Sequence, residues 1–331
     1  MTDTAARQPA EWTPHDLVWI GFPSHADLWE SDLAVAQAEV AAFARAVRCD
    51  GRGERVRLVA ADDEAADVAR ALTRGADVEV TVAPFGDIWL RDTGPIVVRG
   101  AEGVSAIGFR FNGWGGKYDL PNDDTIGAAL AEDGSLPLTR SDWVFEGGAL
   151  DADGTGLAVT TEQCLLNPNR NPGLTREAAE ARLAADLGID RVLWLGDGLL
   201  NDHTDGHVDN LARFVGEGRI AIPVPAGEDD PNAAVYADAR ARAQAFGLEV
   251  VDVPSPGPVM GDGDLIPASY MNFYVGNAAV VVPTYGAPND EAAVAAIGAL
   301  FPGRKAVGLR ADHVLTGGGS FHCISQQVPA A

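Results

Sequence analysis

The sequence predicts a single α/β domain spanning residues 1–331, built from about five repeated units that close into a ring. Three observations predict this fold. Glycine-centred strand–turn–strand patterns recur with their turns roughly 50–65 residues apart, a spacing typical of repeat architectures. Amphipathic, Ala-rich helical patterns fill the intervals. No Ser/Gly-rich linker divides the chain, which favours one domain.

Four segments have an apolar arm on each side of a turn rich in Gly, Asp or Asn, which is the pattern of a β-hairpin. They are residues 96–109, 148–160, 211–223 and 272–283. Closing the units into a ring would remove the exposed edges that an open array of sheets presents. The alternative interpretation is two ordinary α/β domains joined end to end.

Five segments are predicted to be helices, and a strand is predicted between the first two. The helices are Ser31–Val47, Asp62–Thr73, Thr175–Gly188, Tyr236–Gly247 and Asp290–Leu300, and the strand is Arg55–Ala60. The third helix has the clearest boundaries, because a threonine hydroxyl can cap its first turn and a glycine can end its last. Each of the five units would therefore combine a helix with two or three short strands.

The chain carries 24 Lys and Arg against 48 Asp and Glu, a formal net charge of −24. This excess argues against a nucleic-acid partner, since phosphates require clustered Lys and Arg, and it fits a small cationic partner. We see no apolar signal sequence at the start and no apolar run of about 18 residues that would predict a membrane span. Three scattered cysteines are too few for a disulfide framework. We therefore expect a cytoplasmic protein.

Five segments at the edges of the predicted hairpins are unusually polar or glycine-rich. They are Asp87–Pro95, Asn112–Tyr118, Glu146–Gly148, Asp202–Asn210 and Gly317–Gln327. In a ring these edges converge on the axis. We therefore expect one site made from different units, with five candidate catalytic residues: Asp92, Glu146, His207, Asp209 and Cys323.

Cys323 is the candidate nucleophile. Three glycines precede it, which lets the backbone approach a ligand closely, and the residues around it are polar. A thiolate nucleophile needs a base or a lowered pKa, which a histidine elsewhere in the chain can supply. The alternative is a buried, inert cysteine. Cys49 and Cys164 lack such surroundings and are interpreted as structural.

His207 is the best candidate base. It lies in the sequence G-H-V-D, where alternation along a strand would point His207 and Asp209 to the same side. A His–Asp pair that stabilises a turn is the alternative interpretation. His322 and His203 are alternative bases, and neither has this paired carboxylate.

Asp92 and Asp209 would repel each other in one cavity unless a cation lay between them. A planar guanidinium fits two carboxylates, because its N–H groups form a fork that carboxylates can accept. A divalent metal bound by Asp and His side chains is the weaker alternative. The alternative for Asp92 is a solvated loop residue.

At this point the motifs resemble a known family. The segments DIWLRDTGP, FNGWGG, EGGALDADG, TTEQCLLNPNRNP, NDHTDGHVDN and GGGSFHCISQQVP are similar to those of the agmatine deiminase and bacterial peptidylarginine deiminase family. The resemblance runs from Glu11 to Pro329, which is almost the whole chain. It implies the pentein fold, a five-fold pseudosymmetric β/α propeller in one catalytic domain of about five ββαβ-type modules.

The resemblance also implies roles. Cys323 would attack the guanidinium carbon, Asp92 and Asp209 would hold its nitrogens, and His207 would protonate the leaving ammonia and then activate water. Glu146 would orient the histidine or contact the guanidinium. The family implies no metal and no cofactor, and it leaves a homo-oligomer open. The predicted substrate-binding residues are Trp89, Trp114, Gly115, Gly116, His203, Asp205 and Gly318.

One departure concerns the substrate. The family usually has D-E-T-N-G-H before the catalytic histidine, whereas this chain has D-H-T-D-G-H, which places His203 where an acidic residue would meet the cationic tail of agmatine. Asp205 or Asp202 could supply that charge, or His203 could suit the carboxylate of free arginine. The resemblance implies agmatine hydrolysis to carbamoylputrescine. The alternatives are deimination of arginine, free or in peptides, amidino transfer to an amine, and a non-catalytic binding protein.

Overall fold

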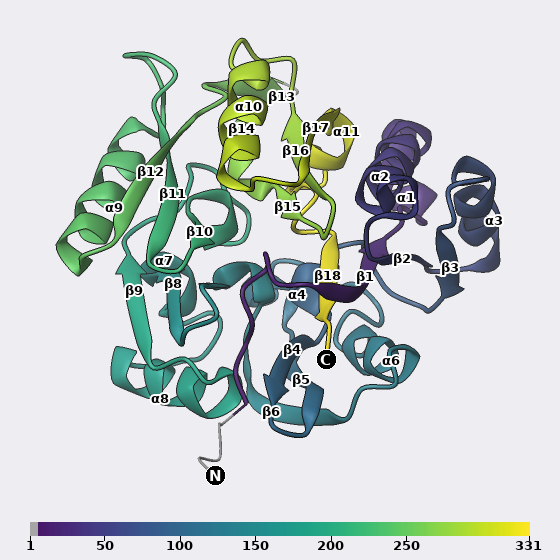
Figure 1. The fold of residues 1–331 in the computed structure, drawn as a ribbon, viewed down its shortest axis with the longest axis horizontal. Helices are drawn as coiled ribbons and strands as arrows, with labels where there is room; N and C mark the ends of the chain where they lie inside the picture. Colours follow the sequence, from purple (N-terminus) through teal and green to yellow (C-terminus); the bar gives the residue numbers. More distant parts are fainter. Residues whose placement is uncertain (1–5, 262) are drawn as a thin grey trace.

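The computed structural model describes residues 6–261 and 263–331 and has a mixed α/β fold. Figure 1 shows the strands toward the middle of the molecule and the longer helices toward its periphery. Among the described residues, no helix is both long enough and apolar enough to span a membrane.

Four of the sheets repeat one pattern, in which an antiparallel hairpin is followed by a helical segment and a third strand parallel to the second. The strands of these sheets are β4 (Ile96–Gly100), β5 (Gly103–Arg110) and β6 (Leu138–Val144); β7 (Asp151–Ala152), β8 (Leu157–Thr161) and β9 (Arg191–Leu195); β10 (Arg213–Gly216), β11 (Arg219–Val224) and β12 (Glu249–Pro254); and β15 (Tyr274–Val275), β16 (Ala279–Thr284) and β17 (Lys305–Arg310). Each predicted hairpin lies at the start of one of these sheets.

A further sheet joins the two ends of the chain. Its order is β18 (Ser325–Pro329), β1 (His15–Gly21), β2 (Arg55–Ala60) and β3 (Glu79–Val82). β18 is antiparallel to β1, and β1 is parallel to β2, so the C-terminal strand supplies the hairpin partner that the other sheets take from the preceding residues. A separate hairpin pairs β13 (Val259–Gly261) with β14 (Asp264–Ile266).

Five of the longer helices connect the second and third strands of their sheets, a sixth connects β2 to β3, and the short helices lie in loops. The α-helices are α1 (Ala26–Trp29), α2 (Leu33–Arg48), α3 (Asp63–Leu72), α4 (Leu90–Thr93), α5 (Gly113–Gly116), α6 (Ile126–Asp133), α7 (Glu162–Leu165), α8 (Arg176–Leu187), α9 (Ala233–Phe246), α10 (Asp290–Leu300) and α11 (Asp312–Leu315). The 3-10 helices are η1 (Glu30–Asp32), η2 (Cys49–Gly51), η3 (Gly147–Ala149), η4 (Val208–Asn210) and η5 (Tyr270–Asn272).

All five predicted helices and the predicted strand are confirmed, with boundaries that differ by a few residues at most. α8 begins as expected, because the Thr175 hydroxyl accepts a hydrogen bond from the Ala178 N–H, and it ends at Gly188, whose φ of +66° is left-handed. The strand β2 matches its prediction residue for residue.

The apolar core reaches the segments that carry the polar motifs. The largest cluster includes Trp19 and Phe43, which are fully buried, and continues to Trp89, Trp114 and Cys323. Two smaller clusters lie between the sheets that follow along the chain. Because close packing restricts side-chain motion, this continuity fixes the polar residues at the end of the core.

A buried ionic cluster links the N-terminal segment to two sheets. The Arg213 guanidinium on β10 donates to Glu11 at 2.7 Å and to Asp151 on β7 at 3.0 Å. It also donates to the backbone carbonyls of Met271 and Phe273. Because nearly all of its donors have acceptors, this arginine can be buried at 1% exposure.

Gly21, at the end of β1, packs closely against the segment before α4, and a substitution there tests this packing. A β-carbon at Gly21 would lie 2.2 Å from the Ile88 carbonyl oxygen, and the backbone would have to move. We expect Gly21→Ala to lower the free energy of unfolding by about 1–3 kcal/mol, the usual cost of overpacking. Chemical denaturation measures this change.

Gly227→Ala is the matched control, because a β-carbon there would have no heavy atom of the described residues within 4 Å. We expect it to change stability by less than about 0.5 kcal/mol, as surface substitutions usually do. Equal stability of the two variants would contradict the packing described for Gly21.

Candidate active site

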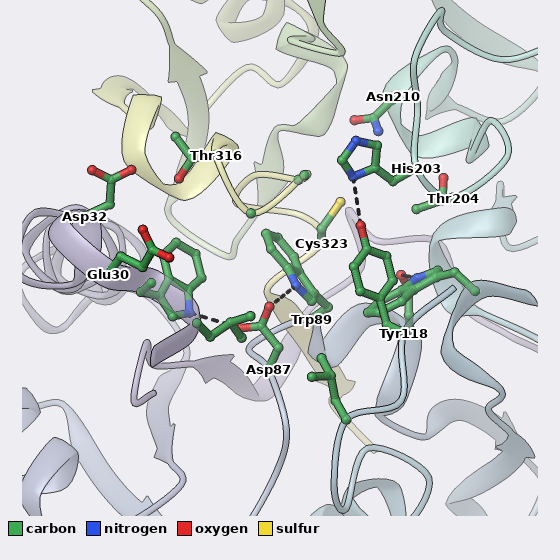
Figure 2. A pocket seen from close by; sticks show the side chains of 18 of the residues that line it. Glu30, Asp32, Asp87, Trp89, Tyr118, His203, Thr204, Asn210, Thr316 and Cys323 are labelled. Carbon is green, nitrogen blue, oxygen red and sulfur yellow. Dashed lines mark hydrogen bonds between the residues drawn. The ribbon is translucent and has the colours of Figure 1, made fainter. Parts of the chain in front are cut away.

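A cavity of about 350 Å³ is lined by four of the five polar segments that the sequence singles out. Asp92, Trp114, His203 and Cys323 each line it from a different segment. Figure 2 shows the Cys323 sulfur beside the indole of Trp89. The structure therefore brings residues together that are as much as 231 positions apart in the sequence.

The five candidate catalytic residues lie in short helices or turns and not in strands. Asp92 is in α4, Glu146 and His207 directly precede η3 and η4, and Asp209 is inside η4. Cys323 lies in the turn before β18, and its carbonyl accepts a hydrogen bond from the Arg91 N–H at 3.0 Å. This hydrogen bond holds the turn that carries Cys323 against α4.

The prediction that His207 and Asp209 alternate along a strand is wrong. The N–H groups of Leu211 and Ala212 donate to the Val208 carbonyl, at 2.9 and 2.8 Å, so the segment folds back on itself as a one-turn helix. Both side chains are nevertheless fully buried, and the charges of both act on Asp92.

Cys323 is 6% exposed and lines the cavity. Its sulfur accepts a hydrogen bond from Asn272 Nδ2 at 2.9 Å, and its S–H can donate to Asp209 Oδ2 at 3.4 Å. Burial, together with the carboxylates of Asp209 and Asp92, raises the pKa of the thiol well above its ordinary value. The thiol is therefore neutral while no cation is bound nearby.

Asn272 has a single possible orientation. Its Oδ1 accepts the backbone N–H groups of His322 and Cys323, at 3.0 and 3.2 Å, so its Nδ2 must be the atom that faces the sulfur. The same Nδ2 contacts Asn210 Oδ1 at 2.9 Å. Asn272 can therefore donate one hydrogen bond to a thiolate without rearrangement.

His207 lies between two carboxylates. Its Nε2 is 3.2 Å from Glu146 Oε2, and its Nδ1 is 3.7 Å from Asp92 Oδ2 and has no hydrogen-bond partner among the described residues. Burial favours the neutral imidazole, but Asp92, Cys164 and Glu146 outweigh it and raise the pKa of His207 well above its ordinary value. His207 is therefore protonated at neutral pH, with Nδ1–H available to a ligand.

Glu146 acts on the side of His207 that faces away from the cavity. Its two oxygens contact Arg170 Nε at 2.8 and 3.2 Å, and Cys164 Sγ is 3.7 Å from Oε2. Burial would raise its pKa, but His207 and Arg170 hold the pKa below its usual range. Although Glu146, Cys164 and His207 offer ligand atoms within 4.8 Å of one another, these hydrogen bonds already occupy the carboxylate.

Asp92 is held by two donors. Its Oδ1 accepts the Gly148 N–H and its Oδ2 accepts the Trp114 indole N–H, both at 2.9 Å. Burial raises its pKa, and the charges of Glu146 and Asp209 add to that effect. Position 148 must be glycine, because a β-carbon there would lie 2.5 Å from His207 Nδ1.

Asp209 has one oxygen occupied and one free. Its Oδ2 contacts His322 Nδ1 at 2.7 Å, whereas its Oδ1 is buried with no hydrogen-bond partner in the described part of the chain. Burial opposes ionisation, but His322 lowers the pKa of Asp209 below its ordinary value. A buried acceptor without a donor beside Cys323 indicates a place for a ligand N–H.

The remaining predicted binding residues divide into two groups. Trp89 lines the cavity and its indole donates to Asp87 at 2.6 Å, while Gly318, with φ of +106°, lines the opening near His203. Gly115, Gly116 and Asp205 are not among the lining residues of this cavity. Asp205 is instead paired with Lys117 and Arg170.

Sequence reasoning missed three side chains that contact the candidate residues. Asn272 falls in a predicted hairpin arm, where its neighbours are apolar, and no pattern marked it. Arg170 lies within the motif TTEQCLLNPNRNP, which was the available signal for it. Cys164 was interpreted as structural, and its contact with Glu146 lies outside any sequence pattern.

Comparison with known proteins gives a consistent result. Residues 7–329 match the family model described as Porphyromonas-type peptidyl-arginine deiminase. A protein of Stutzerimonas stutzeri strain A1501, named agmatine deiminase, is 36% identical over 97% of this chain and 95% of its own length.

Solved structures agree with this comparison. The agmatine deiminase of Enterococcus faecalis has a TM-score of 0.91 and 31% identity, and covers 100% of this chain and 98% of its own. A cysteine-to-serine variant of the C. jejuni agmatine deiminase with substrate bound has a TM-score of 0.92 and 26% identity, with coverage of 100% and 98%. The chain belongs to the Porphyromonas-type peptidyl-arginine deiminase family, and it is similar over almost its whole length to proteins named agmatine deiminases.

Proposed function

We propose that this chain hydrolyses the guanidinium group of agmatine to N-carbamoylputrescine and ammonia, through a covalent intermediate on Cys323. The observation that carries the proposal is a pair of buried atoms close to the cavity that Cys323 lines, Asp209 Oδ1 and His207 Nδ1, which have no hydrogen-bond partner in the described part of the chain. The similarity to proteins named agmatine deiminases supports it.

Binding brings a cation to a group of buried carboxylates. Asp209 Oδ1 and Asp92 would accept the guanidinium N–H groups, and such charge-assisted hydrogen bonds are about twice as strong as neutral ones. The substrate charge also favours the thiolate of Cys323, so binding lowers the pKa that the two carboxylates raise. The thiol proton leaves to water as the cation enters.

The reaction then takes two steps. The thiolate bonds to the guanidinium carbon, His207 gives the Nδ1 proton to the leaving nitrogen, and ammonia departs. Neutral His207 next takes a proton from water, and the water oxygen bonds to the carbon. The carbon–sulfur bond then breaks with its electrons on sulfur, and the remaining hydroxyl proton passes to the thiolate, which restores the thiol and releases the neutral ureido product. Glu146 keeps the histidine oriented through Nε2 in both steps.

We also propose that the five sheets form one closed, five-fold pseudosymmetric propeller in a single catalytic domain. The repeated ββαβ pairing supports this arrangement, and so does the pairing of β18 with β1. A closed ring would direct the loops that carry the candidate residues toward one axis.

The opening of the cavity bears on the substrate tail. His203 and Tyr118 line the cavity, and the Tyr118 hydroxyl is 3.3 Å from His203 Nδ1. Glu30 and Asp32 also line the cavity, and Figure 2 shows them on the opposite side of the view. The two acidic residues favour an amine-bearing tail such as that of agmatine. His203 favours the second candidate, free arginine, whose α-carboxylate it could meet.

The nucleophile is tested by substitution. We expect Cys323→Ala to abolish release of ammonia and of the ureido product from agmatine, because no other cysteine lines the cavity among the described residues. Cys49→Ala should retain activity. Ammonia release without an added amine also separates hydrolysis from amidino transfer, and retained turnover in Cys323→Ala would overturn the mechanism.

The raised pKa of Cys323 makes a pH prediction. Because an elevated pKa keeps the thiol protonated, alkylation of the free enzyme by uncharged iodoacetamide should be slow at neutral pH and still be rising above about pH 9. A cationic haloacetamidine should label Cys323 much faster at neutral pH, since its charge favours the thiolate. Peptide mass spectrometry measures both rates; equal rates at neutral pH would contradict substrate-assisted ionisation.

The substrate tail is tested by comparing kcat/KM for agmatine, free L-arginine and an arginyl peptide. We expect agmatine to exceed arginine by about tenfold or more, because the α-carboxylate of arginine would meet Glu30 and Asp32. His203→Glu should raise the ratio further. A preference for arginine of similar size would make arginine the substrate.

A further inference from the structure

His322 lies between two buried carboxylates, those of Asp209 and Glu11, next to the proposed guanidinium site. Its Nδ1 is 2.7 Å from Asp209 Oδ2, and its Nε2 is 2.8 Å from Glu11 Oε2. The side chain is 2% exposed, so water does not screen either contact. No step of the proposed reaction uses this residue.

Neither carboxylate has a hydrogen to give to the imidazole. Glu11 accepts from Arg213 at 2.7 Å through Oε2 and from the Val275 N–H at 2.7 Å through Oε1. Burial opposes its ionisation, but Arg213 and His322 lower the pKa of Glu11 far below its ordinary range. A neutral imidazole has one donor and one acceptor nitrogen, and an acceptor nitrogen would repel the carboxylate oxygen facing it.

We propose that His322 is a positioning residue that donates a hydrogen bond from each ring nitrogen and turns Asp209 so that Oδ1 faces the substrate. Both ring nitrogens donate, and Asp209 Oδ2 is thereby occupied while Oδ1 remains open. His322 acts through Asp209 and does not touch the reacting atoms. Its effect on substrate binding rests on the function proposed above; its protonation state does not.

Asp209 depends on His322 for its ion pair, because the neighbouring arginines lie near Glu11 instead. Arg213 and Arg91 both lie near Glu11, with Arg91 Nη2 at 3.8 Å from Oε2, and Arg91 Nε donates to the His322 carbonyl at 3.3 Å. Asp209, in contrast, forms an ion pair with His322 alone within residues 6–261 and 263–331. His207 and Arg213 also lower the pKa of Asp209, but less than His322 does. Loss of His322 would therefore leave the buried carboxylate without a cation in direct contact, which raises its pKa.

His15 provides an internal comparison. It is also buried, and its Nδ1 is 3.2 Å from Glu54, but its Nε2 has no partner among the described residues. A histidine with one carboxylate differs from a histidine held between two. His15 lies outside the cavity lining, so His15→Gln is a suitable control for removal of a buried histidine.

The first experiment is nitrogen NMR of the substrate-free, 15N-histidine-labelled enzyme, with the His322 signals assigned by their loss in His322→Gln. We expect both ring nitrogens of His322 to carry a proton at neutral pH, because each lies within 2.8 Å of a carboxylate oxygen. One unprotonated ring nitrogen at neutral pH would overturn the proposal, whether or not agmatine is the substrate. If the variant does not fold, the wild-type His322 signals are assigned by elimination, from the signals lost in Gln variants of the other five histidines.

The second experiment measures kcat and KM for agmatine against pH in His322→Gln and His15→Gln. We expect His322→Gln to raise KM by about tenfold or more, the cost of a lost charged hydrogen bond, with a smaller change in kcat. Because Asp209 must be ionised to bind a cation, its raised pKa should move the acidic limb of kcat/KM upward by about one pH unit or more. An unshifted limb would show a merely structural role and overturn the proposal; His15→Gln should keep the wild-type profile.

Discussion

Each buried carboxylate of this site must be matched by a cation or by several N–H donors, and this requirement determines the arrangement around it. Glu146 is matched by Arg170 and His207, and Asp209 by His322. Asp92 has two neutral donors and a histidine at 3.7 Å. Asp209 Oδ1 has no donor among the residues that the structure describes. A guanidinium would supply both the positive charge and an N–H donor for this oxygen.

The fold supplies these partners from distant parts of the chain. The N-terminal segment brings Glu11, β10 brings Arg213, and the turn before β18 brings Cys323 and its neighbour. Because each group is held by residues from another sheet, the site cannot assemble from one unit alone. Gly148 adds a steric condition, since any side chain there would fill the space between Asp92 and His207.

Much of this could be predicted from the sequence, because hairpins and helices have periodic patterns and the polar segments interrupt them. The helix Asp290–Leu300 and the strand Arg55–Ala60 were predicted with their final boundaries. The conformation of His207 was not, since hydrogen bonds within η4 replace strand pairing there. Contacts such as that of Asn272 with the Cys323 sulfur depend on which loops meet in space, and a single sequence holds no periodic signal for that.

The central claim is that the guanidinium carbon becomes bonded to Cys323 during turnover. The most direct measurement is acid quenching of the enzyme during reaction with agmatine, followed by mass spectrometry of its cysteine-containing peptides. The account predicts a transient adduct, equal in mass to agmatine less ammonia, on the peptide that carries Cys323. Turnover with no adduct on that peptide, or with the adduct on the peptide carrying Cys164 or Cys49, would contradict it.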